Sequence, residues 1–72
     1  MSMEKNRKIS DIFPIGQNVF FHSGNYIGAY AKVEKVENES KSPLAIFGFL
    51  ITVRFDNGTI GLVEKTEHMT KL

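Results

Sequence analysis

Apolar and polar residues alternate along several short stretches of the chain, and this period of two is typical of strands with one buried face. In residues 18–22, Val19 and Phe21 fall on one face, while Phe20 and His22 fall on the other. Both faces of this first predicted strand therefore carry an aromatic ring.

A second strand is predicted over residues 29–36, where Ala31 and Val33 alternate with polar or aromatic neighbours. Val36 falls out of phase with this alternation. A β-bulge inserts one extra residue into a strand and shifts the phase in this way where the strand bends. We therefore expect a bent second strand with a bulge before Val36, followed by an exposed polar loop at residues 37–43.

A hairpin is predicted at Asn57-Gly58, the pair favoured in a two-residue type I′ turn because both central residues need a positive φ. Apolar residues on the two sides of this turn alternate in a register that agrees with it. The pairs expected to face the core are Phe55 with Ile60 and Val53 with Leu62, and those expected to face outward are Arg54 with Gly61 and Thr52 with Val63.

The apolar run at residues 44–51 is either the start of the hairpin's first strand or a strand of its own. Continuing the alternation puts Phe47 and Phe49 inside and Ile46 and Leu50 outside. Outward apolar side chains need a cover, or they form a patch that a partner covers. Ile46 and Leu50 are therefore the candidates for a partner interface, including one between two copies of the chain.

Residues 1–11 are polar, so we expect a flexible basic tail there. The basic residues of this tail are Lys5, Arg7 and Lys8. At the other end, residues 65–72 are expected to form a short turn and a last strand, with Met69 and Leu72 closing the core.

Together these stretches make five short strands and essentially no helix in residues 12–72. An open sheet would leave exposed edges, so the predicted fold is all-β, a small five-stranded antiparallel barrel. A chain of 72 residues buries only about 60% of its unfolded surface, so we expect a single domain. With 42% apolar and 24% charged residues, the composition is that of a globular protein.

The chain contains no cysteine, which excludes disulfides and thiolate metal sites. Its longest apolar run is far shorter than the roughly 20 residues that span a bilayer, and residues 1–11 lack the apolar core of a secretion signal. We expect a cytoplasmic protein with no membrane partner. The net charge of +1 is not strongly basic, so nucleic-acid binding would need locally concentrated charge.

The stretch from residue 16 to residue 36 resembles the KOW motif of NusG-type transcription factors and several ribosomal proteins. The residues that carry the resemblance are Gly16, Val19, Phe21, Gly24, Gly28, Ala31, Val33 and Val36. The resemblance implies an SH3-like barrel of five strands and a role in binding RNA. Gln17 and Ala31 depart from the acidic residue and the glycine usual in the family, and residues 25–27 are not lysine-rich.

Aromatic residues interleaved with basic ones favour a surface on which bases of single-stranded nucleic acid stack beside positive charge. The alternative is that the rings pack across strands and the lysines are simply solvated. Gly24 and Gly28 are interpreted first as positions of positive φ in a tight loop, and second as amides that meet a phosphate. The candidate ligand-binding residues are Phe20, His22, Asn25, Tyr26, Tyr30, Lys32 and Arg54.

No motif in the chain indicates catalysis or metal binding. Ser23, His68 and Asp56 supply the residue types of a triad, but no nucleophile elbow accompanies them. His22 and His68 have no recognised metal-ligand spacing. We therefore predict a non-catalytic binding module without metal or cofactor, with RNA, or less favourably DNA, as its ligand. The alternative is a protein-interaction or assembly subunit, either a monomer or a homodimer.

Overall fold

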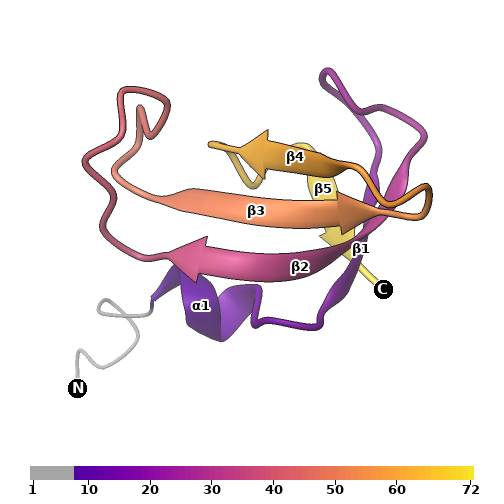
Figure 1. Ribbon diagram of the computed structural model, residues 1–72, viewed down its shortest axis with the longest axis horizontal. Helices are drawn as coiled ribbons and strands as arrows, with labels where there is room; N and C mark the ends of the chain where they lie inside the picture. Colours follow the sequence, from indigo (N-terminus) through magenta and orange to yellow (C-terminus); the bar gives the residue numbers. More distant parts are fainter. Residues whose placement is uncertain (1–7) are drawn as a thin grey trace.

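The fold is a five-stranded antiparallel sheet with one short helical turn, seen in a computed structural model that describes residues 8–72 (Figure 1). The elements are α1 (Ile9–Ile12), β1 (Asn18–Phe21), β2 (Tyr30–Glu37), β3 (Leu50–Phe55), β4 (Ile60–Val63) and β5 (Met69–Lys71). The strands lie in the order β4-β3-β2-β1-β5. The prediction of a small all-β domain is thus confirmed. Within residues 8–72 no ladder joins β4 to β5, so the sheet is open and a closed barrel is not confirmed.

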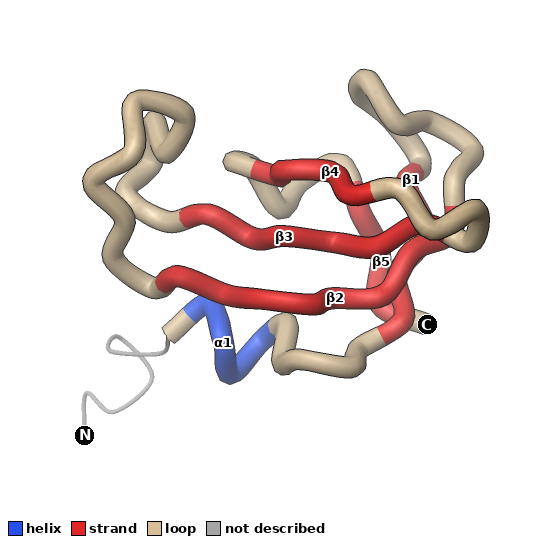
Figure 2. Tube along the Cα trace, viewed as in Figure 1, coloured by secondary structure: helices blue, strands red, loops and turns tan. Residues whose placement is uncertain are grey.

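The core lies on one face of the bent sheet. Val19 and Phe21 of β1 are fully buried there, whereas Phe20 is half-buried and His22 is exposed, as the alternation predicted. The other strands contribute Ala31, Val33, Ile51, Val53, Val63 and Met69, and Phe13 joins them from the segment before β1. Loops gather at the two ends of the strands (Figure 2).

β2 contains the predicted bulge. Val33 lies opposite Val53, but Lys35 lies opposite Thr52, so Glu34 is the additional residue. The shift brings Val36 back to the buried face, opposite Ile51. The break in the sequence alternation is therefore explained by a change of phase within one continuous strand.

The segment before β1 is more ordered than predicted. We expected a tail over residues 1–11; residues 1–7 lie outside the described residues, but Ile9–Ile12 forms a helical turn that contacts β2. Ile9 and Ile12 pack against the core, and the Ser10 amide donates to Asn38 Oδ1 at 2.9 Å. Structure therefore begins inside the segment expected to be a tail. No helix within residues 8–72 has the length and apolar character needed to cross a membrane.

The β3–β4 hairpin forms, but the predicted register is wrong by one residue. The Gly58 amide donates to the Phe55 carbonyl and the Phe55 amide to the Thr59 carbonyl, both at 2.9 Å, which leaves residues 56–58 as a three-residue loop. Gly58 has a φ of +90°, as the last residue of a type I turn with a glycine bulge requires. Val53 consequently lies opposite Gly61 rather than Leu62.

This slip turns every side chain of β4 to the other face. Gly61 and Val63 are buried, while Ile60 and Leu62, expected in the core, are 48% and 39% exposed. A Cβ on residue 61 would lie 2.6 Å from Phe55 Cε2 and 3.2 Å from Tyr26 Cζ. The space left by Gly61 is therefore filled by aromatic rings.

Residues 44–49 do not continue β3 toward its N-terminus. Turns occupy this region, held by hydrogen bonds from the Ala45 amide to Ser42 O and from the Gly48 amide to Ala45 O. Ile46 is exposed, as predicted, but Phe47 is also exposed, contrary to prediction. Leu50 is only 8% exposed, so it is not the exposed surface residue that was expected.

The C-terminal strand forms as expected, but it contributes less to the core. Met69 is buried opposite Phe21, as predicted. Leu72 is 66% exposed and does not close the core. Of the two residues expected to close the core at this edge, Met69 does so and Leu72 does not.

Candidate functional site

The sequence-predicted ligand-binding residues divide between the two faces of the sheet. Phe20 and Tyr30 lie directly opposite each other on β1 and β2, with ring centroids 4.9 Å apart and planes tilted by 50°. Tyr30 is 53% exposed, and Lys32 follows it on the same outer face. We call Phe20 and Tyr30 the outer aromatic pair. Lys32 is its adjacent lysine.

Arg54 lies beside Lys32 in the β2–β3 ladder, but its charge is compensated. Its Nε and Nη2 donate to the two carboxylate oxygens of Glu34, at 2.6 and 3.0 Å, and its Nη1 donates to the Gly58 carbonyl at 2.9 Å. The hydrogen bonds from Arg54 lower the pKa of Glu34 and raise that of Arg54. A bidentate pair of this geometry fixes Arg54 against the sheet rather than presenting it to a phosphate.

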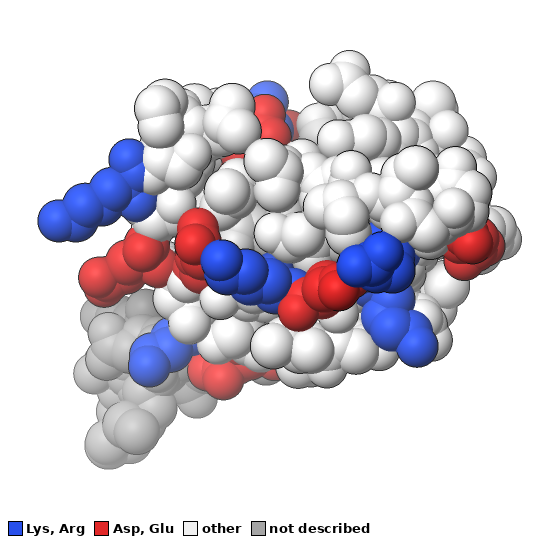
Figure 3. Space-filling view, viewed as in Figure 1, with Lys and Arg blue, Asp and Glu red and all other residues white. Residues whose placement is uncertain are grey.

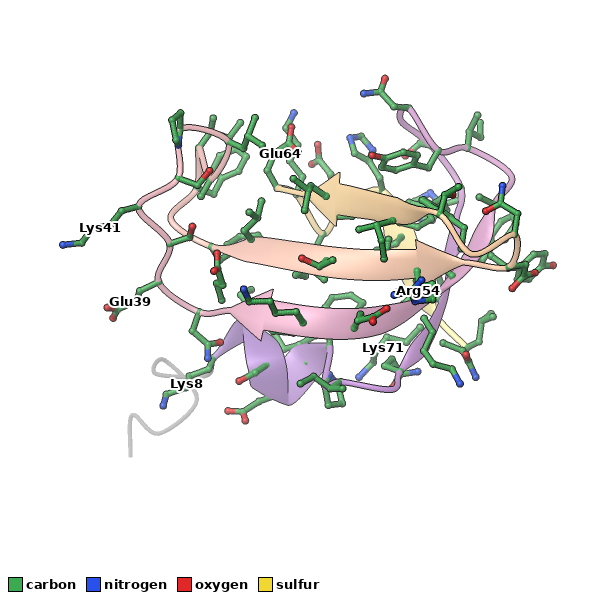
Figure 4. The ribbon with its side chains drawn as sticks, in the orientation of Figure 1. Lys8, Glu39, Lys41, Arg54, Glu64 and Lys71 are labelled. Atoms are coloured by element: carbon green, nitrogen blue, oxygen red, sulfur yellow. The ribbon has the colours of Figure 1, made fainter. Side chains whose placement is uncertain are left out.

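Other charges on the same face also alternate in sign. Lys35 Nζ lies 3.4 Å from a carboxylate oxygen of Glu37 on β2. In Figure 3, basic and acidic side chains form a mixed row across the middle of the face. In Figure 4, the labelled lysines Lys8, Lys41 and Lys71 project from separate parts of the chain. The described residues on this face thus form a mixed-charge row, which attracts a polyanion weakly.

Tyr26, in contrast, belongs to the core side of the sheet. Its ring meets Phe21 edge-on at 5.4 Å and Phe55 at 4.9 Å, and it is half-buried. We call Phe21, Tyr26 and Phe55 the inner aromatic cluster. Asn25, the neighbouring candidate, is exposed in the same loop. Tyr26 therefore closes one end of the core and packs with the inner rings rather than with the outer aromatic pair.

The loop that carries Tyr26 is held in place at both ends. Gly24 and Gly28 have φ values of +83° and +88°, as predicted for a tight loop. The Gly28 amide donates to the Phe21 carbonyl at 2.7 Å. Ser23 Oγ lies 2.7 Å from His68 Nδ1, and the His68 ring packs where a Cβ on Gly24 would lie.

Ser23 and His68 line a pocket of about 200 Å³ together with Tyr26, Glu64 and Lys65. Asp56, the third residue type of the triad written from the sequence, lines a different groove. The structure thus brings together two of the three residues, and their hydrogen bond ties the loop to the turn before β5. In residues 8–72 no group of three histidine or acidic side chains is placed to hold a metal ion.

The edge strand β4 is a surface that sequence reasoning missed. Among the described residues it pairs with β3 on one side only, and its sequence Ile60-Gly61-Leu62-Val63 contains no charge. Ile60 and Leu62 point away from the core and are partly exposed. The opposite edge, β5, has only three residues and includes Lys71. The exposure of Ile60 and Leu62 follows from the hairpin register. That register was predicted incorrectly from the sequence.

A groove of about 550 Å³ lies at the end of the sheet between the Tyr26 loop and the β3–β4 turn. Tyr26, Tyr30, Phe55 and Ile60 give it apolar and aromatic walls. Asp56 is the only charged residue among the described residues that line it. Tyr26 and Tyr30, two of the predicted site residues, both line this groove. The surface that they share therefore differs from the one expected.

Comparisons with known proteins add no relative: no protein-family model, no curated protein and no solved structure matches the chain.

Proposed function

We propose that the protein is a non-catalytic binding module whose principal ligand is another protein chain, bound along the edge of β4. The observation that carries this proposal is the uncharged edge strand with its outward Ile60 and Leu62. Of the two classes of ligand predicted from the sequence, a protein fits this edge better than a nucleic acid does.

The physical basis is strand addition. An edge strand presents backbone N–H and C=O groups that an extended segment of a partner can pair with, and alternate side chains then supply specificity. Proteins usually protect such edges with charges, prolines or very short strands. Lys71 protects β5 in this way, whereas β4, which is one residue longer, contains neither a charge nor a proline.

A pair of matched variants tests this proposal. Leu62→Lys places a charge on the β4 edge, and Thr70→Lys places the same charge on the exposed face of β5. Capture of partners from a cell extract, together with the oligomeric state in solution, is compared between the two variants and the wild type. We expect Leu62→Lys to lose partners or self-association that Thr70→Lys retains. Equal behaviour of the two folded variants would contradict the proposal.

Nucleic acid is the second candidate, and the outer aromatic pair beside Lys32 is the observation that favours it. Base stacking on an aromatic ring is worth about 1–3 kcal/mol per base. Binding of a labelled single-stranded oligonucleotide is therefore expected to weaken by that amount in Tyr30→Ala, and to fall with salt less steeply in Lys32→Gln. Absence of binding to wild-type protein at low ionic strength would exclude this candidate.

We also propose that the chain is an SH3-like domain of KOW type. Five short antiparallel strands and the bulge that bends β2 support this assignment. A structure in solution in which β4 and β5 approach closely enough to complete a barrel would strengthen it.

A further inference from the structure

We propose that the groove between the Tyr26 loop and the β3–β4 turn binds an organic cation, namely the basic side chain of a partner protein segment. This inference rests on the proposed function in one respect, that the cation belongs to a protein. The cation-binding chemistry itself rests on the groove alone.

The residues that line the groove have the composition that a cation requires. Tyr26, Tyr30 and Phe55 provide three aromatic rings, and Asp56 provides the carboxylate. Ring faces attract a cation through their quadrupole, and Arg or Lys side chains bind there with their aliphatic stems against apolar surface. Ile60 supplies such a surface at the start of β4.

The rings are positioned without help from a ligand. Tyr26 packs against Phe55 with centroids 4.9 Å apart, and Tyr30 packs against Phe20 at the same separation. A site whose side chains are already held loses less conformational freedom when it binds.

Among the described residues that line the groove, the one charged side chain, that of Asp56, favours a cation over an anion, while Lys32 lies outside this lining. Arg54, the nearby basic residue that donates to the turn at Gly58, has its charge compensated by Glu34. Asp56 would repel a phosphate but attract an ammonium or guanidinium group. Tyr30 belongs both to this groove and to the outer face used by the nucleic-acid candidate, but the groove contributes Asp56 where the outer face contributes Lys32.

The position of the groove connects it with the β4 edge. Ile60 both begins β4 and lines the groove. A segment paired along β4 would carry a residue near its end to this point, and a basic residue there would meet Asp56 and the rings. We therefore assign the cation to a lysine or arginine of the segment that pairs with β4.

The test titrates the intact protein with choline and with dimethylbutanol, its uncharged isostere, while NMR follows the ring resonances of Tyr26, Tyr30 and Phe55. We expect saturable shifts with choline and none with dimethylbutanol at the same concentrations. Loss of one ring, in Tyr30→Leu, should weaken choline binding about two- to fivefold, the range of an exposed cation–π contact. Equal shifts with both compounds would overturn the cation site.

The contribution of the carboxylate is tested with two variants of equal charge change. Asp56→Asn removes the acid in the groove, and Glu39→Gln removes an exposed acid in the loop before β3 (Figure 4). Choline affinity should fall in Asp56→Asn and stay at the wild-type value in Glu39→Gln. Equal loss in both variants would assign the effect to net charge and overturn the role of Asp56.

A second experiment, with two peptides, tests whether the bound cation belongs to a protein. Acetyl-Val-Lys-Val-amide is expected to bind more tightly than choline, and its norleucine analogue to leave the ring resonances unshifted. Equal binding of the two peptides would overturn the assignment to a basic side chain, and binding of choline without the lysine peptide would overturn a protein source. Because Leu62 does not line the groove, Leu62→Lys can fail in partner capture while choline still binds, so the two proposals fail separately.

Discussion

Two neighbouring phenylalanines, Phe20 and Phe21, belong to aromatic groups with different roles. Phe21 is 1% exposed and packs with Tyr26 and Phe55 in the inner cluster. Phe20 is half-buried and packs with the ring of Tyr30 on the outer face. The ring types are similar, so the side of the pleat on which each ring lies decides whether it stabilises the fold or is available to a ligand.

The two groups also differ in what surrounds them. The inner cluster fits against the bare backbone of Gly61, which allows rings to approach where any other side chain would lie. The outer pair is bordered by the exposed Lys32 and by solvent. Close packing makes the inner cluster sensitive to changes of volume, whereas the outer pair tolerates them.

The largest expected effect comes from truncating Phe21, with truncation of Phe20 as the comparison. Phe21→Ala removes a buried ring and should lower the free energy of unfolding by about 3–5 kcal/mol. Phe20→Ala removes a cross-strand contact and should cost about 1 kcal/mol or less. Chemical denaturation measures both values. Similar losses in the two variants would show that the two faces of β1 are not energetically distinct.

A smaller effect is expected from Gly61→Ala, which adds one methyl group beneath the inner cluster. The new Cβ would lie 2.6 Å from Phe55 Cε2, so the ring must move, and we expect a loss of about 1–3 kcal/mol. Adding Phe55→Leu removes the atoms in conflict, so the double variant should lose less than the sum of the two single variants. A strictly additive double variant would refute the close contact between Gly61 and Phe55.

The smallest effect is expected on the outer face, from Glu34→Gln. Arg54 lowers the pKa of Glu34 below its ordinary value of 4.5, so the pair stabilises the folded state above that pH and loses its effect as pH falls through the lowered pKa. The wild type should therefore exceed Glu34→Gln in stability at neutral pH, and the difference should vanish in acid. Denaturation curves across this range measure it, with Glu39→Gln as the control. A difference that does not change with pH would contradict the role of this ion pair.

Much of the sheet could be predicted from the alternation of residues. The faces of β1, the bulge in β2, the existence of the β3–β4 hairpin and the burial of Met69 all follow from local patterns of apolar residues and turns. These features share one cause, because a strand with one buried face repeats every two residues. Of the residues predicted to lie outward, Phe20 and Tyr30 are paired across β1 and β2 with Lys32 on the same face, whereas Tyr26 is not among them.

The candidate sites were less predictable because they depend on contacts between distant segments. Leu50 was expected on an interface and is buried, and Ile60 and Leu62 were expected in the core and are exposed. Arg54 was expected to be available to a ligand, but its guanidinium pairs with the carboxylate of Glu34 on the neighbouring strand. The groove near Asp56 requires the Tyr26 loop and the hairpin turn to meet, which no local pattern encodes.

The turn at Asn57-Gly58 separates what the local sequence determines from what tertiary packing decides. The sequence determined that the chain turns there, because Gly58 accepts a positive φ and apolar strands flank it. The predicted two-residue loop was wrong, because an Asn-Gly pair also suits the three-residue loop that forms. Packing decided this, because the three-residue loop places Gly61 under the rings of Tyr26 and Phe55, where there is no room for a larger side chain. That choice moved Ile60 and Leu62 to the surface and created the β4 edge on which the proposed function rests.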